Sequence, residues 1–186
     1  MKKFLILLLI ALPIIIFSQE NIGRKVHLYG EIDEKIIGQT ALRFNFQNPK
    51  VEKYTLGLLK DEGLPTLLWT SMFLPDAEYT EEEILNTLNE NNVRNIIFIK
   101  LEDLKKGNYG YGTNLTSSMV YYVDIETIDF IKIKTEFYKI DEALPKRPSW
   151  LVIGEASGGS EFSTAKSVMK KIIGRIIDGL DEKGAF

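Results

Sequence analysis

The sequence contains no cysteine and only one histidine, His27, among its 186 residues. Without cysteine the chain forms no disulfide bond, has no thiolate nucleophile and offers no cysteine for attachment of a lipid. It also lacks the several His and Cys ligands on which most zinc sites depend. We therefore expect no metal site and no cofactor. Stability must come from burial of the apolar residues, which make up 45% of the sequence.

An excess of positive charge is also missing. The chain has 23 Lys and Arg against 26 Asp and Glu, which gives a formal net charge of −3. The basic residues are scattered, and runs such as Lys105-Lys106 and Lys170-Lys171 are pairs and not patches. Nucleic acid attracts concentrated positive charge. The composition therefore predicts no nucleic-acid partner.

The amino terminus has the pattern of a secretory signal peptide. Lys2 and Lys3 precede an apolar run of 14 residues from Phe4 to Phe17, and polar residues follow from Ser18 onward. This run is shorter than the roughly 20 residues that a membrane-spanning helix needs, and it contains Pro13. We expect cleavage after Ser18, export to the periplasm or the medium, and no stable membrane span afterwards. An uncleaved amino-terminal anchor is the alternative.

The remaining residues, 19–186, are enough for one domain with an apolar core. Their first half alternates between strand and helix patterns. Asn48-Pro49 and Gly63 predict the two ends of a helix over 49–62, and Thr80 with Glu83 forms a capping box at the start of a second helix. The apolar runs around these helices predict strands at 26–30, within 36–46, at 64–74 and at 95–101. The order β-α-β-α-β over residues 36–101 favours a partly parallel sheet.

The second half is richer in strand patterns. Residues 117–124 and 127–140 are separated by Ile125-Glu126 and predict an antiparallel hairpin. A strand at 149–156 and an amphipathic helix over 162–180 follow. We expect an α/β fold with an α+β tendency, in which a mixed sheet of five to seven strands packs with three main helices.

No segment matches a catalytic motif. The stretch from Gly154 to Ser160 lacks the first glycine of a nucleophile elbow, because Glu155 stands two residues before Ser157. It also lacks the lysine of a phosphate-binding loop, since Ser160 and Glu161 follow Gly159. We interpret it as a flexible connection between strand and helix. The sequence thus nominates no catalytic and no cofactor-binding residue.

Two further features have structural explanations. His27 could act as a base near neutral pH, but no local motif supplies a nucleophile or an orienting acid for it. The three acids Glu81, Glu82 and Glu83 occupy successive helical positions, which point in different directions and do not converge on one ion. They are better explained as stabilising the positive end of the helix dipole.

Residues 107–114 (GNYGYGTN) are the segment that most favours binding. Glycines free the backbone there, while Tyr109 and Tyr111 offer large amphipathic surfaces of the kind found in binding loops. An ordinary connector of the same composition is the alternative. We predict a loop here, with Tyr109 and Tyr111 as candidate binding residues.

The order of elements resembles a group of small bacterial envelope proteins, many of them lipoproteins. The resemblance covers about residues 48–183 and is carried by LPTLLWTSMFLP, by YTEEEILNTLNENNVRNIIFIKL and by the strand Trp150-Leu-Val-Ile-Gly-Glu155 before the last helix. The domain is similar to the amino-terminal α/β domain of the Tol-system protein TolB and of its curli-secretion relative. The chain departs from that group in lacking the lipid-attachment cysteine, and Asn92-Val-Arg94 replaces the usual Gly-x-Asp pattern.

These observations predict an exported, non-catalytic envelope domain that binds a protein or another envelope component. Sheet edges and the segment with Tyr109 and Tyr111 are the expected contacts. Two alternatives stay open: an exported hydrolase with a non-standard site using His27 and a serine, and a carrier with a small-ligand pocket between the sheet and the closing helix. The sequence leaves the oligomeric state undetermined.

Overall fold

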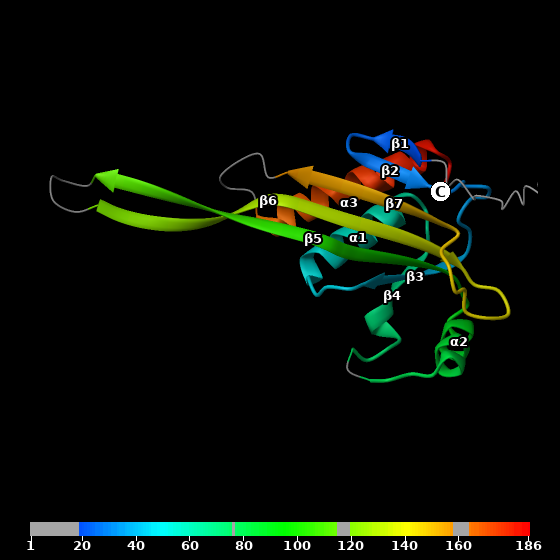
Figure 1. Ribbon diagram of the computed structural model, residues 1–186. Coiled ribbons are helices and arrows are strands. Elements are labelled where there is room, and N and C mark those ends of the chain that lie inside the picture. The colour runs from blue at the N-terminus through cyan, green and yellow to red at the C-terminus, as the bar shows by residue number, and fades with distance from the viewer. Residues whose placement is uncertain (1–18, 76, 115–119, 158–163) are drawn as a thin grey trace, which may run out of the picture.

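Seven strands form one mixed sheet in the order β1-β2-β7-β6-β5-β3-β4, with helices α1 and α3 on one face (Figure 1). The computed structural model describes residues 19–75, 77–114, 120–157 and 164–186, so the expected signal peptide lies outside the described residues. Within these ranges, the helices are too short or too polar to span a bilayer. The predicted α/β fold with a mixed sheet and three helices is confirmed.

The parallel half follows the predicted β-α-β-α-β order. Strand β3 is parallel to both of its neighbours, β4 and β5. The elements are β3 (Gln39–Phe44), α1 (Pro49–Asp61), β4 (Thr66–Leu68), the 3₁₀ helix η1 (Trp69–Ser71), α2 (Glu81–Glu90) and β5 (Val93–Asn114). The strand predicted over 64–74 is wrong beyond Leu68. There the chain coils into η1, where the Ser71 hydroxyl donates to the Leu68 carbonyl at 2.6 Å.

The antiparallel half contains β6 (Val120–Lys139), β7 (Trp150–Ser157), β2 (Val26–Tyr29), β1 (Gln19–Gly23) and the closing helix α3 (Ala165–Glu182). The hairpin predicted around Ile125-Glu126 is wrong. Both residues lie inside β6, opposite Tyr109 and Asn108 of β5. The hairpin therefore consists of β5 and β6, and residues 107–114 are strand and not loop.

The main core lies between the sheet and the two helices α1 and α3. All six residues predicted to face inward from the last helix are buried, namely Val168, Ile172, Ile173, Ile176, Ile177 and Leu180. They pack close to the sheet because β7 offers a glycine there. A Cβ on Gly154 would stand 2.6 Å from Cγ2 of Ile172 and 2.9 Å from Cδ1 of Ile176. This glycine thus serves helix packing.

Both predicted helix starts are confirmed. Asn48 caps α1 by accepting from the Val51 N–H at 3.2 Å, with proline at the first helical position. Thr80 and Glu83 form the reciprocal capping box of α2. Its backbone and side-chain hydrogen bonds with Thr80 lower the pKa of Glu83.

The opposite face of the sheet is only partly covered. A second cluster packs at one end of that face, where α2 and η1 meet the strands; its buried members are Ala41, Phe73, Leu88, Val93 and Ile140. Beyond this cluster, β5 and β6 carry alternating charged residues such as Lys100, Lys134 and Glu136. The partly covered face is therefore where polar side chains gather.

Candidate functional site

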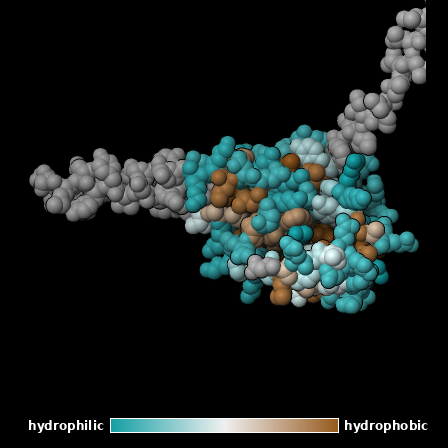
Figure 2. Space-filling model, turned by 60° about the horizontal axis from the view of Figure 1, so that its bottom comes forward, coloured by the Kyte–Doolittle hydropathy of each residue, from teal (hydrophilic) through white to brown (hydrophobic). Residues whose placement is uncertain are grey.

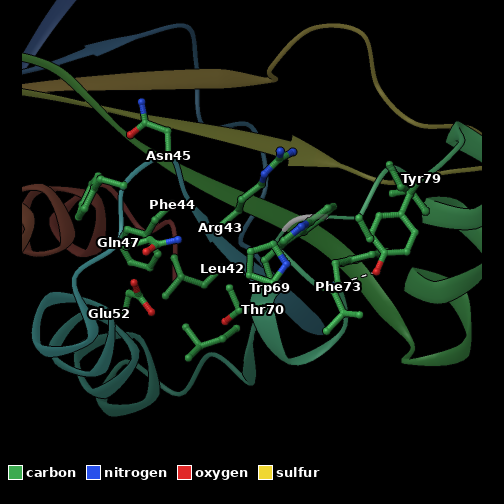
Figure 3. A pocket seen from close by; sticks show the side chains of 16 residues that line it. Leu42, Arg43, Phe44, Asn45, Gln47, Glu52, Trp69, Thr70, Phe73 and Tyr79 are labelled. Atoms are coloured by element: carbon green, nitrogen blue, oxygen red, sulfur yellow. Dashed lines mark hydrogen bonds between the residues drawn. The ribbon is translucent and has the colours of Figure 1, made fainter.

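A cavity of about 490 Å³ opens at the carboxyl ends of the parallel strands β3 and β4. Strand β3 ends at Phe44 and turns towards α1, while β4 ends at Leu68 and turns into η1. In α/β sheets, ligand sites commonly form at this end of the strands, where the connecting loops diverge. Among the residues that line the cavity are Arg43, Gln47, Glu52, Trp69, Phe73 and Tyr79 (Figure 3).

Arg43 lies between two aromatic rings at the wall of this cavity. Its guanidinium carbon is 4.7 Å from the centroid of Trp69 and 4.8 Å from that of Phe98. Trp69 in turn stacks on Phe73, with ring centroids 4.2 Å apart. Phe73 also makes an edge-on contact with Tyr79. The row of contacting aromatic rings thus continues from Trp69 through Phe73 to Tyr79 (Figure 3). Two aromatic rings thus hold one cation.

The positive charge of Arg43 is not neutralised locally. The side chain is exposed, and within the described ranges no carboxylate lies at ion-pair distance from its guanidinium. Partial burial lowers the pKa of Arg43, an effect that nearby Tyr138 opposes. A guanidinium stays protonated in proteins in spite of such shifts. The wall of the cavity therefore presents a fixed cation.

Hydrogen bonds hold the segment that forms the right-hand wall in Figure 3. The Leu74 N–H donates to the Tyr79 hydroxyl at 2.9 Å, and Thr80 then caps α2. Leu74 itself is 71% exposed although it lines the cavity. Figure 2, in which the bottom of Figure 1 comes forward, shows apolar residues exposed in patches that hydrophilic residues border. The rim of the cavity therefore offers apolar surface beside the cation.

The opposite wall is polar and partly committed to local structure. Asn45 joins the end of β3 to β5, because its Oδ1 accepts from the Leu101 N–H at 2.7 Å. The Glu52 carboxylate accepts from the Asn48 N–H at 3.1 Å at the start of α1. Gln47 is exposed between them along the chain. The charged residues that line the cavity within the described ranges are Arg43 and Glu52.

A second polar group lies on the same sheet face, next to Phe98. The carboxylate of Glu136 is 5% exposed and lies 2.6 Å from Lys100 Nζ and 2.9 Å from Lys134 Nζ. Tyr138 donates its hydroxyl proton to this carboxylate at 2.6 Å. Burial opposes ionisation of Glu136, but the hydrogen bonds from Lys100, Tyr138 and Lys134 outweigh it and lower the pKa to about 2. Because every acceptor is engaged, we interpret Glu136 as a structural anion.

The structure places the candidate binding residues Tyr109 and Tyr111 in strand β5, opposite Ile125 and Val123 of β6. The predicted loop is therefore wrong, because glycines in a two-stranded ladder are tolerated when the partner strand supplies the β-forming residues. Figure 1 shows that this part of the β5–β6 hairpin projects beyond the rest of the sheet. The binding role of the two tyrosines stays a prediction.

His27 lies on β2, in register with Ile153 of β7 and Asn21 of β1. Ser157 lies four residues further along β7, about 13 Å away at the usual strand rise, and its hydroxyl accepts from Lys25 Nζ at 3.3 Å. Among the described residues, no serine hydroxyl forms a hydrogen bond with this imidazole. In the same part of the chain, no three His, Asp or Glu side chains converge as metal ligands.

The remaining expectations concern glycines and a pocket. Gly154 and Ser157 belong to β7, so the first part of the stretch from Gly154 to Ser160 is strand and not a flexible connection; residues 158–163 lie outside the described residues.

Between the sheet and α3 the cavity measures only about 10 Å³. A single water needs about this much space. The pocket expected there for a small-ligand carrier is therefore too small.

Sequence reasoning missed Arg43, Trp69 and Phe98. One signal was available, since Arg43 places a charge between the apolar residues Leu42 and Phe44 of β3. The partners that make it distinctive come from η1 and from β5, and no local spacing joins them.

The sequence matches no known family model and no curated protein. Among solved structures, a PelC variant from Paraburkholderia phytofirmans, described as a dodecamer, is similar with a TM-score of 0.52 and 12% identity over 83% of this chain and 96% of that one. A second PelC dodecamer from this organism has a TM-score of 0.49 and 13% identity, over 83% of this chain and 95% of that one. A minor lipoprotein from Acinetobacter baumannii has a TM-score of 0.28 and 7% identity, over 82% of this chain and 90% of that one. At such identity, the first similarity shows a shared fold.

Proposed function

We propose that this chain is an exported, non-catalytic envelope domain that binds a protein partner through the projecting part of the β5–β6 hairpin, residues 107–114 and 120–128, here called the ribbon. The observation that carries the proposal is the length of this hairpin. Strand β3 pairs with β5 only as far as Ile99, and β7 pairs with β6 only as far as Phe130. The pairing of β5 with β6 continues to Asn114 and Val120.

A two-stranded ribbon of this kind becomes more stable when a partner binds to it. Isolated two-stranded hairpins are marginally stable in water, and both outer edges of the ribbon carry backbone groups without a third strand in the described residues. Such edges accept an added strand from another chain. The sequence of the ribbon is rich in Tyr, Val and Ile, including Tyr109 and Tyr111, and these residue types favour strand pairing and protein interfaces.

The partner could be a different envelope protein or a second copy of this chain. The PelC structures are described as dodecamers, so a chain with this fold can assemble with itself. The export step rests on the amino-terminal pattern of residues 1–18. Fractionation of cells together with amino-terminal sequencing tests it, with Gln19 as the expected first residue; a retained Met1 would favour the anchor.

Site-specific photo-crosslinking tests the binding role. A benzophenone amino acid replaces Tyr109 or Tyr111 in intact cells, and a matched control replaces the exposed Lys53 on α1. We expect the two ribbon positions, and not the control, to crosslink to one defined protein, identified by mass spectrometry. Equal crosslinking from all three positions, or none above background, would contradict the proposal. A crosslinked product of two identical chains would identify self-assembly.

A further inference from the structure

We propose that the cavity beside Arg43 binds a carboxylate attached to an apolar group, as in an N-acylated amino acid or the carboxyl-terminal residue of a peptide. The proposal goes beyond the ribbon and concerns a different surface. It starts from an exposed cation that two rings hold at a cavity wall without a counter-ion among the described residues.

The arrangement of Arg43 selects an oxyanion. A guanidinium has two flat faces and carries its five N–H donors around its edge. The guanidinium carbon of Arg43 lies over both aromatic rings, 4.7 Å from the centroid of Trp69 and 4.8 Å from that of Phe98. Since no carboxylate pairs with Arg43 among the described residues, its N–H donors are available to a ligand, and a carboxylate accepts two of them in parallel.

The charge balance of the cavity favours one negative charge over several. Arg43 is the only cation among the described residues that line it, and Glu52 lines the same cavity. Glu52 is held in place, because its carboxylate accepts from the Asn48 N–H at 3.1 Å. A phosphate or a polycarboxylate would bring extra negative charge towards Glu52, where like charges repel. A monocarboxylate brings a single negative charge, so its repulsion from Glu52 is smaller.

The remaining lining explains the apolar part of the ligand. Leu74 is 71% exposed at the cavity, and the side chains of Ile84 and Phe46 contribute further apolar surface. An apolar group next to the carboxylate would cover these side chains and remove them from water. The volume of about 490 Å³ lies within the range of small-ligand sites.

Calorimetric titration of the purified protein tests this. The probes are N-acetylphenylalanine and its amide, which differ only in the carboxylate. We expect saturable binding of the acid and binding of the amide weaker by at least about tenfold, because a charge-assisted bidentate contact is lost. A tetrapeptide ending in phenylalanine, with a free or an amidated terminus, distinguishes the sources: tighter binding than the small acid indicates a peptide terminus, and equal binding indicates a small acid.

Variants assign the binding to Arg43. Arg43→Gln removes the cation, and we expect it to lower the affinity for the acid by about tenfold or more. Arg43→Lys keeps the charge but lacks the planar guanidinium, and we expect a smaller loss of affinity. Arg147→Gln, at an exposed arginine outside the cavity, should bind like the wild type. If Arg43→Gln does not fold, Arg43→Lys still carries the comparison.

No saturable binding of the acid to the wild type, or equal binding of acid and amide, would overturn the proposal. So would binding that both Arg43 variants retain in full. These outcomes are independent of the ribbon, since crosslinking from Tyr109 and Tyr111 uses a different part of the chain. Either proposal can therefore fail while the other stands.

Discussion

Lys100 on β5 and Glu136 on β6 form an ion pair of 2.6 Å, although the Glu136 side chain is only 5% exposed. Lys134 adds a second contact at 2.9 Å, and Tyr138 donates to the same carboxylate. The two strands are thus joined by charge on the face that α1 and α3 leave uncovered. Because Glu136 pairs in register with Phe98, this anion also lies next to the ring that contacts Arg43.

We expect Glu136→Gln to destabilise the protein by about 2–4 kcal/mol. Removing one partner of a buried ion pair leaves the other charges without compensation, and here Lys100 and Lys134 lose their shared anion. Their side chains are 29% and 24% exposed, so water compensates in part. Denaturant unfolding followed by circular dichroism measures the change in the free energy of unfolding.

Glu155→Gln is the matched control for this substitution. Glu155 lies on the neighbouring strand β7, is 37% exposed, and is 3.9 Å from Lys132 Nζ. We expect a change of at most about 0.5 kcal/mol, as for surface ion pairs in general. Equal effects of the two substitutions would show that burial of Glu136 is not what makes its contacts important.

Acid should weaken the fold through the same residue. The folded-state pKa of Glu136 is about 2, below the reference value of 4.5. An acid with a lowered pKa contributes stability that is present above its unfolded-state pKa and is lost as the pH falls towards the folded-state pKa. We expect this contribution to fall by about 3 kcal/mol between pH 5 and pH 2. Unfolding titrations across this range should show a shallower decline in Glu136→Gln; identical declines would contradict the assignment.

The helices could be predicted from sequence because their signals are local. The Asn48-Pro49 start of α1, the Thr80–Glu83 box of α2 and the apolar stripe of α3 each lie within a few turns of chain. Strand β1 was missed because Gln19–Gly23 contains one apolar residue, Ile22, and pairs only at the edge of the sheet. Its position depends on β2, which a local pattern does not reveal.

The hairpin and the cavity depend on contacts that are distant in sequence. Residues 107–114 have the composition of a loop, and only their pairing with β6 makes them strand. In the same way, Arg43 becomes distinctive only where η1 brings Trp69 and β5 brings Phe98 against it. Contacts between residues distant in sequence determine both the β5–β6 hairpin and the surroundings of Arg43, so neither feature could be derived from residue spacing.

We expect Thr135→Val to stabilise the protein by about 1 kcal/mol. Thr135 is 3% exposed on the core face of β6, and its hydroxyl oxygen has no hydrogen-bond partner among the described residues. A buried polar group without a partner lowers stability, and valine has nearly the same shape without the hydroxyl. Thermal and denaturant unfolding measure the gain.

Thr55→Val provides the comparison for this prediction. Thr55 is fully buried on α1, and its hydroxyl donates to the Val51 carbonyl at 2.9 Å. Removing this hydrogen bond should cost about 1 kcal/mol, so the two substitutions should change stability in opposite directions. A loss of stability in Thr135→Val would mean that its hydroxyl has a partner, such as a bound water in the small adjacent cavity.

Two glycines should respond in opposite ways to alanine. In Gly154→Ala the new Cβ would lie 2.6 Å from Ile172 Cγ2 and 2.9 Å from Ile176 Cδ1, so α3 must shift away from β7. We expect a loss of about 1–3 kcal/mol, as for other overpacked cores. In Gly57→Ala, within α1, no neighbouring atom stands within 4 Å of the new Cβ. The higher helix propensity of alanine should add about 0.5–1 kcal/mol.

Denaturant unfolding of the two variants, under identical conditions, checks the pair. If Gly154→Ala were as stable as the wild type, the contact between α3 and β7 would have to be looser than the structure shows. Because Ile176 belongs to the buried face of α3, a second change, Ile176→Val, should recover part of the loss in Gly154→Ala by removing the Cδ1 methyl group that stands 2.9 Å from the new Cβ. The same change in the wild-type background should cost about 0.5–1.5 kcal/mol. Opposite signs in the two backgrounds would establish that Gly154 is required by the close approach of α3.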